Sequence, residues 1–263
     1  MSQTFNDRPF TAREFFKDTW VITGVGCESY LVIGKEKAMM VDTGMSHLNL
    51  KEFAQTLSDK PIFVVNTHGH FDHTGGNGFF DEVYTHPYAA GEAKRCFGDP
   101  AGYPLDYEIK TFEEGHVFEL GDRPIETIFI GAHSPGSVAY LDKNARLLFT
   151  GDELECGQVL CMGKAQPGEM RAVEKHLNNM KKLKARVSEF DLICPAHNGT
   201  PILPRYIDTF IEMDEAILHG EEGLKQIYSP TWPGFGRENE NMRRLQREGT
   251  TAIIYDQSDY PLK

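Results

Sequence analysis

The apolar positions in the N-terminal part of the chain form short runs that turn residues separate. These runs predict strands at Trp20–Gly24, Ser29–Gly34 and Lys37–Val41, with glycines between them. Beyond Ser46, apolar residues recur at helical spacing and predict a helix over about His47–Leu57. The apolar run Pro61–Val65 then predicts a buried strand. The chain therefore begins as a meander of strands, followed by a helix and a further strand.

The same order of strands followed by a helix then repeats. A short strand at Glu82–Thr85 and a helix over Pro87–Cys96 complete the first half. In the second half, strands are predicted at His116–Leu120, Pro124–Ile130, Ser137–Leu141 and Arg146–Thr150. They are followed by an amphipathic helix over Glu169–Val187, a strand at Asp191–Cys194 and a helix over Leu203–Leu218. Two mixed sheets packed face to face, with helices outside, would bury the apolar faces of these elements.

Two long segments, Phe97–Lys110 and Glu153–Gly168, show no regular pattern. Long loops in compact domains are often functional, so the first is either a plain surface connection or a flap over a pocket. Near the C-terminus we predict a charged helical patch over Glu238–Glu248 and a final strand at Thr251–Tyr255. We expect a single domain over residues 1–263, with a core at about 19–200 and a C-terminal extension of helix and strand over 201–263.

Composition narrows the classes of partner. Hydrophobic residues make up 40% of the 263 residues, which is enough for a sizeable core. The 39 carboxylates outnumber the 27 Lys and Arg, and a net charge of −12 argues against a nucleic-acid partner. There is no apolar run of the ~20 residues that cross a membrane, and none at the N-terminus that would act as a secretory signal. Five irregularly spaced cysteines suit a reducing compartment. We therefore expect a cytoplasmic protein with a small-molecule substrate, and leave a homodimer open.

The candidate chemistry is concentrated directly after the strand Pro61–Val65. The stretch NTHGHFDH holds His68, His70, Asp72 and His73. Alternate residues of an extended segment face the same side, so the first two histidines can point at one metal ion. The other two residues come just past that point, where a turn could aim both at a second ion. The alternative reading is a polar surface loop that is rich in histidine.

Four further residues share this placement, because each directly follows a predicted strand. They are Asp42, His133, Asp152 and His197. A lone histidine after a strand is more often structural than a ligand. All four in this order, together with His-x-His-x-Asp-His, are a strong signal for a metal site. Imidazole and carboxylate ligands suit Zn, Fe or Mn, and the set contains no thiolate that would strongly favour zinc.

With these motifs the sequence resembles the metallo-β-lactamase superfamily of hydrolases over roughly residues 19–200. It looks closest to the glyoxalase II-like branch, in which the ligand after His133 is an Asp. The resemblance implies an α+β fold, a four-layer αβ/βα sandwich of two mixed sheets, with a dinuclear metal site on one edge. It assigns ligands by match of motif: His68, His70 and His133 for the first metal, Asp72, His73 and His197 for the second, and Asp152 as a bridge between them. Asp42 resembles the carboxylate that orients a ligand imidazole.

These assignments predict a dinuclear metal-dependent hydrolase. Two metals about 3.5–4 Å apart can hold a bridging hydroxide, which would attack a small carbonyl substrate such as a thioester, ester or lactone. We expect two divalent ions, Zn first, with Fe or Mn as alternatives. Asp72 could also act in catalysis by orienting the nucleophile.

Other functions remain open at this point. The fold could carry an iron-dependent redox enzyme resembling the persulfide dioxygenases, a phosphodiesterase, or a binding module with a decayed site. β-Lactamase activity is not expected, because those enzymes are generally exported and the sequence shows no signal peptide.

Several histidines fall outside the motifs. His176 lies beside the apolar stripe of its helix and His219 at a helix end, so both are interpreted as solvated or dipole-related residues. His86 is expected to help start the helix at Pro87. His47 follows Asp42 closely in the sequence, so it could lie at the rim of the pocket.

Overall fold

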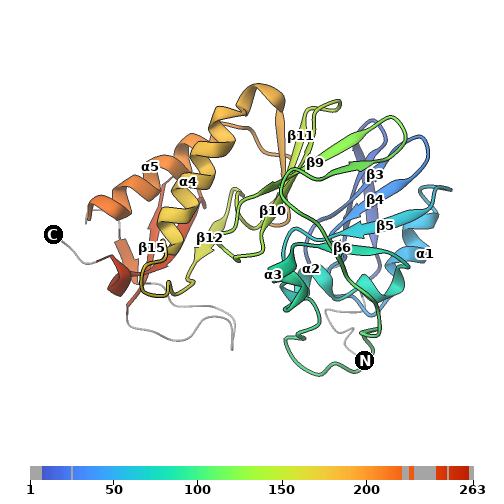
Figure 1. The fold of residues 1–263 in the computed structure, drawn as a ribbon, viewed down its shortest axis with the longest axis horizontal. Helices are drawn as coiled ribbons and strands as arrows, with labels where there is room; N and C mark the ends of the chain where they lie inside the picture. Colours follow the sequence, from blue (N-terminus) through green and yellow to red (C-terminus); the bar gives the residue numbers. More distant parts are fainter. Residues whose placement is uncertain (1–7, 25, 221–224, 228–240, 248, 261–263) are drawn as a thin grey trace.

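Two mixed sheets stand face to face at the centre of the computed structural model, which describes residues 8–24, 26–220, 225–227, 241–247 and 249–260 (Figure 1). The strands of the first sheet, in spatial order, are β1 (Thr11–Phe16), β2 (Thr19–Thr23), β3 (Ser29–Ile33), β4 (Ala38–Val41), β5 (Ile62–Val65), β6 (Val83–Thr85) and β7 (Lys110–Thr111). Strands β2 to β4 form the expected antiparallel meander, β1 adds a further antiparallel strand to it, and β4 to β7 are parallel. The parallel strands end together, at the edge where the histidine stretch begins.

Alternating side chains of the first sheet build two separate layers of core. In β4, Met39 and Val41 face the second sheet, whereas Ala38 and Met40 face the other way, against helix α1 (Leu50–Gln55). This period of two is what an extended strand dictates when both of its faces are buried. Two further short helices, α2 (Phe71–Thr74) and α3 (Pro87–Ala90), and the 3₁₀ turn η2 (Asn77–Phe79) follow β5 and β6.

The second sheet contains five strands and carries two long helices on its outer face. Its spatial order is β13 (Leu192–Pro195), β11 (Leu147–Gly151), β10 (Val138–Asp142), β9 (Pro124–Phe129) and β8 (Val117–Glu119). Helices α4 (Ala172–Ala185) and α5 (Tyr206–His219) pack together and share a core with this sheet, to which Ile128, Leu141 and Met180 contribute. Helix, sheet, sheet and helices together make the four-layer αβ/βα sandwich, and the expected fold class is confirmed.

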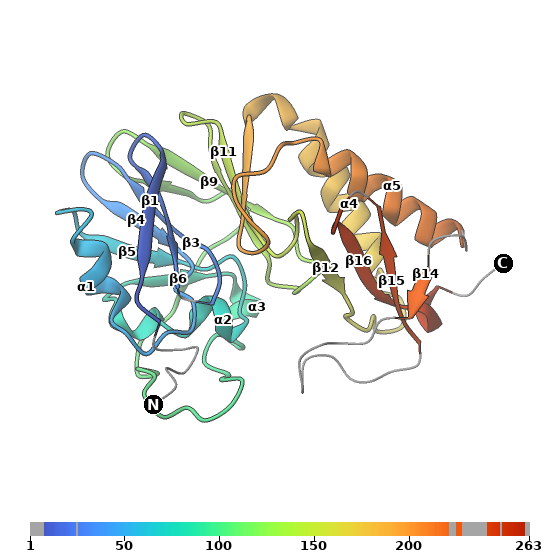
Figure 2. The same cartoon turned by 180° about the vertical axis from the view of Figure 1, so that it is seen from behind.

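A third sheet packs on α4 and α5 and was not expected. Its order is β12 (Gln158–Cys161), β16 (Ala252–Asp256), β15 (Met242–Gln246) and β14 (Lys225–Ile227). Figure 2 shows it beside the two helices, away from the first sheet. The 3₁₀ turns η3 (Val187–Glu189) and η4 (Gln257–Asp259) complete the elements of this side.

Two sequence predictions in this region are wrong. Strand β12 lies inside Glu153–Gly168, which we had predicted to be irregular. The predicted helix over Glu238–Glu248 is replaced by strand β15 at Met242–Gln246; residues 238–240 and 248 lie outside the described residues. Pairing with β16, whose five residues are all buried, overrides the helical propensity of the charged side chains.

Other elements also differ from their prediction. Strand β1 was not predicted, because its mostly exposed edge position imposes no alternation of apolar residues. The helix predicted over Pro87–Cys96 ends at Ala90. The His86 side chain accepts a hydrogen bond from the backbone N–H of Tyr88, so its predicted role in starting that helix is confirmed. Within the described residues, no helix has the length and apolar character needed to cross a membrane.

Candidate metal centre

All the candidate ligands lie where strands of the two facing sheets end. His68, His70, Asp72 and His73 follow β5 of the first sheet. The other three come from the second sheet: His133 lies between β9 and β10, Asp152 follows β11 and His197 follows β13. Each sheet therefore supplies part of one cluster, and the cluster lies at the joint between them.

Three imidazoles form the first group. The Nδ1 atom of His70 lies 3.0 Å from Nε2 of His68 and 3.0 Å from Nε2 of His133. Nitrogen ligands at about 2.0–2.1 Å from a tetrahedral zinc ion would be separated by about 3.3 Å. The three nitrogens are therefore close to the spacing that one cation requires.

A carboxylate and two imidazoles form the second group. Oδ2 of Asp72 lies 3.7 Å from Nε2 of His73 and 3.5 Å from Nε2 of His197. Together with the first group, these are sets of side chains whose donor atoms lie close enough to share a metal ion. The turn into α2 brings the last two residues of the histidine stretch to this second position, since His70 precedes the first residue of that helix.

Asp152 lies between the two groups and faces each with a different oxygen. Its Oδ2 is 3.6 Å from Nε2 of His133, and its Oδ1 is 3.3 Å from Nε2 of His73 and 3.5 Å from Nε2 of His197. Among the residues that the structure describes, His73 Nε2 and Asp152 Oδ1 are buried atoms without a hydrogen-bond partner. Buried polar atoms rarely stay unsatisfied. A cation between them would satisfy both, so the residues present fit a metal.

Hydrogen bonds on the far side of the rings fix which nitrogen is free. His73 Nδ1 lies 2.9 Å from Oδ2 of Asp42, whose Oδ1 in turn accepts a 2.7 Å bond from the backbone N–H of Thr67. His133 Nδ1 lies 3.1 Å from the carbonyl oxygen of Leu160. Both partners are acceptors, so Nδ1 carries the proton and the lone pair on Nε2 faces the cluster. Thr67 and Leu160 carry no signal in the sequence, because no residue type marks a backbone group that orients a ring or its carboxylate partner.

The two groups differ in how readily they carry protons. Burial lowers the pKa values of His68, His70 and His133 below the ordinary range, so these rings are neutral. Burial also opposes the charge on His197, but Asp152 and Asp72 outweigh it and raise the pKa of His197 to about 9. In the metal-free protein the first group is therefore ready to bind, whereas the second holds at least one proton.

Metal binding to the second group should weaken as the pH falls below about 9. Below that pKa a cation must displace the His197 proton, which alone should lower the affinity by about tenfold per pH unit, or about a hundredfold from pH 9 to pH 7. Burial also opposes the charge on His73, but the neighbouring carboxylates raise its pKa well above the ordinary range, so displacing its proton adds to this loss. The three rings of the first group have no such proton to lose in this range. Titration with Co²⁺ at pH 7, 8 and 9, followed by visible absorption, measures both affinities. Equal pH dependence of the two binding steps would contradict this assignment.

The segment 97–110 packs against the histidine stretch. The ring of Tyr103 lies 4.7 Å from that of Phe71 and 4.5 Å from that of His47, measured between centroids. Phe71 is the residue between His70 and Asp72, so this segment and His47 both lie next to the ligand-bearing turn.

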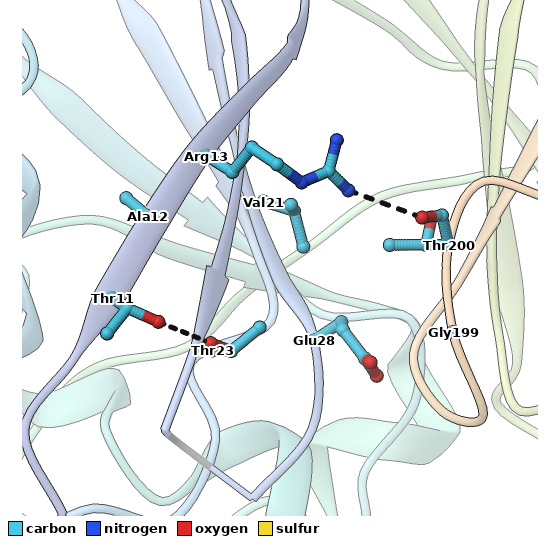
Figure 3. Close-up of a pocket in the computed structure, with 8 residues that line it drawn as sticks. All are labelled: Thr11, Ala12, Arg13, Val21, Thr23, Glu28, Gly199 and Thr200. Carbon is cyan, nitrogen blue, oxygen red and sulfur yellow. Dashed lines mark hydrogen bonds between the residues drawn. The ribbon is translucent and has the colours of Figure 1, made fainter.

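A cavity of about 340 Å³ opens beside the loop that follows His197 (Figure 3). Its lining comes from the β1–β2 hairpin, the β2–β3 turn and that loop: Thr11, Ala12, Arg13, Val21, Thr23, Glu28, Gly199 and Thr200. The backbone N–H of Glu28 donates a 2.7 Å bond to the carbonyl of Ala196, so the cavity wall is tied to the residue before His197. This cavity has the size of a small-molecule site.

Comparison with known proteins places this geometry in a family. A family model described as the Metallo-beta-lactamase superfamily matches residues 22–197. Human acyl-coenzyme A thioesterase MBLAC2 is 28% identical over 167 residues, which cover 50% of this chain and 59% of that protein. A hydroxyacylglutathione hydrolase of Gloeobacter violaceus is 30% identical over 159 residues, covering 60% of this chain and 58% of that protein. The chain thus spans less than two thirds of the length of these relatives.

Solved structures give the same result for the fold. A metallo-beta-lactamase from Pontibacter korlensis matches with a TM-score of 0.60 and 19% identity, covering 79% of this chain and 99% of the other. At that level of identity the match concerns the architecture alone. The family model covers most of the sandwich and every candidate ligand, so the chain belongs to the metallo-β-lactamase superfamily.

Proposed function

We propose that the protein is a dinuclear metallo-hydrolase that cleaves a small carbonyl compound, with thioesters as the first class. The observation that carries the proposal is the position of Asp152, which presents one oxygen to each of two three-residue groups. A site for a single ion would need only one of those groups.

Each residue has a distinct part in this proposal. His68, His70 and His133 would hold one cation, Asp72, His73 and His197 the other, and Asp152 both. When bound, a pair of divalent cations supplies hydroxide at neutral pH and polarises a carbonyl oxygen. Asp72 would in addition orient the attacking group by accepting a hydrogen bond. Zn is the first expectation, with Fe or Mn as alternatives, because all the donors are nitrogen and oxygen.

The substrate class is supported by one relative and by the cavity. The human relative is named an acyl-coenzyme A thioesterase. The cavity of about 340 Å³ beside the loop after His197 would hold a small acyl or thiol portion. The cavity also offers a cation, Arg13, on an otherwise acidic chain.

The experiment begins with metal quantification on the purified protein. Thioesters, lactones and phosphodiesters are then screened with the metal that is found, and oxygen consumption is recorded in parallel. Two metals per chain with thioester turnover would support the proposal. One metal per chain, turnover of phosphodiesters alone, or oxygen consumption with bound iron would overturn it.

Charge reversal at Arg13 should weaken the binding of anionic thioesters. Its guanidinium lies at the cavity wall, 3.4 Å from the carbonyl oxygen of Thr200, and is exposed (Figure 3). Loss of a charge-assisted contact worth about 1.5–3 kcal/mol should raise KM about tenfold or more for an anionic thioester in Arg13→Glu. kcat should remain unchanged, because Arg13 is not among the candidate ligands.

Lys17→Glu provides the matched control for this variant. Lys17 lies in the turn between β1 and β2 and lines a different cavity, so its reversal changes the net charge equally without altering the proposed substrate site. A similar rise in KM for both variants would indicate a general electrostatic effect and contradict the assigned cavity.

A further inference from the structure

We propose that His176 and Asp214 are positioning residues for the metal centre, and that they act through Glu153. The inference rests on the proposed metal function and adds residues from helices α4 and α5 to it. It also corrects the prediction that His176 is solvated: its side chain is fully buried, as is that of Asp214.

The first step is the contact between the two helices. His176 Nδ1 on α4 lies 2.8 Å from Oδ2 of Asp214 on α5, and its Nε2 lies 2.9 Å from the carbonyl oxygen of Glu153. Both partners are acceptors. A neutral imidazole has only one N–H to donate, so the ring must be doubly protonated to make both bonds. Asp214 outweighs burial and raises the pKa of His176 to about 9, which agrees with this charge.

The second step runs from Glu153 to the candidate ligands. Oε1 of Glu153 accepts hydrogen bonds of 2.7 Å from the backbone N–H groups of both Ala132 and His133. Glu153 also directly follows Asp152 in the chain. One buried residue therefore ties together two ligand-bearing loops, and the imidazolium of His176 holds its backbone in place.

The arrangement is not explained by stability alone. A buried ion pair contributes little compared with packed apolar side chains of similar size, because both charges lose their hydration. It does fix direction: the bonds to Glu153 determine where the backbones of Asp152 and His133 emerge. Supporting residues of this kind typically cost 10–100-fold in metal affinity when they are removed.

The test compares metal affinities, measured by competition with a chelator and by the absorption spectrum of the Co²⁺ form. The principal variant combines His176→Leu with Asp214→Leu, which removes both charges and leaves neither unpaired. We expect the affinity of the first group to fall by about 10–100-fold and the Co²⁺ bands to shift.

Two variants of Glu153 separate its hydrogen bonds from its charge. Glu153→Gln keeps an oxygen that can accept both backbone N–H groups, so its affinity should stay within about threefold of the unmodified protein. Glu153→Met fills similar space without an acceptor and should behave like the double variant. If the double variant does not fold, His176→Phe combined with Asp214→Asn takes its place, because it also removes both charges and the bond to the Glu153 carbonyl while filling the space of the two side chains.

Asp142→Asn is the control for general loss of stability. Asp142 is equally buried and pairs with Arg123, and neither contacts a candidate ligand through any described bond. Its metal affinity should be unchanged. Retention of affinity in the double variant and in Glu153→Met, or an equal loss in Asp142→Asn, would overturn the inference. Absence of metal from the unmodified protein would instead overturn the proposed function, and the inference with it.

Discussion

Replacing Asp152 with alanine should lower turnover at least about a thousandfold and leave less than two metals per chain. A residue that only supports a ligand costs about 10–100-fold when removed, and Asp152 faces both groups directly. The seven candidate ligands include two carboxylates, Asp72 and Asp152, and the variant loses the one that lies between His133 and His73. The imidazoles would then face each other across the cluster with less negative charge to offset the cations.

Asp42→Asn is the comparison for this variant. Asp42 contacts His73 on the side away from the cluster. Its replacement by Asn should therefore lower turnover by about 10–100-fold and leave most of the metal in place. Measuring kcat and metal content on both variants shows which substitution has the larger effect. Asp152→Ala with two metals and full activity would rule out the bridging assignment, and a larger loss in Asp42→Asn would reverse the two roles.

Removing the metals with a chelator should abolish turnover and lower the Tm. A ligand present at 100–1,000 times its Kd stabilises the folded state by about 2.7–4.1 kcal/mol, and for a chain of this size that corresponds to a Tm lower by roughly 5–15 °C per site. The metal-free protein must also keep Asp72 and Asp152 beside protonated rings instead of cations. Thermal unfolding with and without chelator, and again after adding metal back, measures the shift.

The Asp152→Ala variant serves as the control in this experiment. Because it should already hold fewer metals than the unmodified protein, chelation should shift its Tm by less. An unchanged Tm in the unmodified protein, with turnover intact, would show that the cluster has no metal function.

The placement of the ligands could be anticipated from sequence because it depends on local rules. Strand patterns before Asp42, His68 and Asp152 are short and apolar, and they end in turn residues. The structure brings Asp42 and His68 to one edge because β4 and β5 are parallel neighbours, whereas Asp152 reaches that edge from β11 of the second sheet. His68 and His70 do share one group, as predicted, but they do so across a bend at residues 67–69 and not through alternation in an extended segment.

The contacts that support the site could not be read in this way. His176 and Asp214 lie on separate helices, and nothing in either sequence pattern shows that the helices place them opposite each other. The sequence predicts only a loop at Glu153, because the direction of its side chain depends on the path of the chain between β11 and β12. Strand β15 was missed for the same reason, since its neighbour β16 imposes the extended form through pairing between distant segments.

The division of the ligands between the two sheets has a consequence for the order of assembly. Neither half of the chain contains both complete sets of donors: the first ends with four of them, and the second contributes His133, Asp152 and His197. The chain therefore cannot bind two cations with all their ligands until the two sheets have docked during folding. A metal-sensitive dye or a Co²⁺ spectrum would consequently report the rate of that last stage of refolding. A chain truncated before residue 197 would be unable to bind both cations with their full set of ligands.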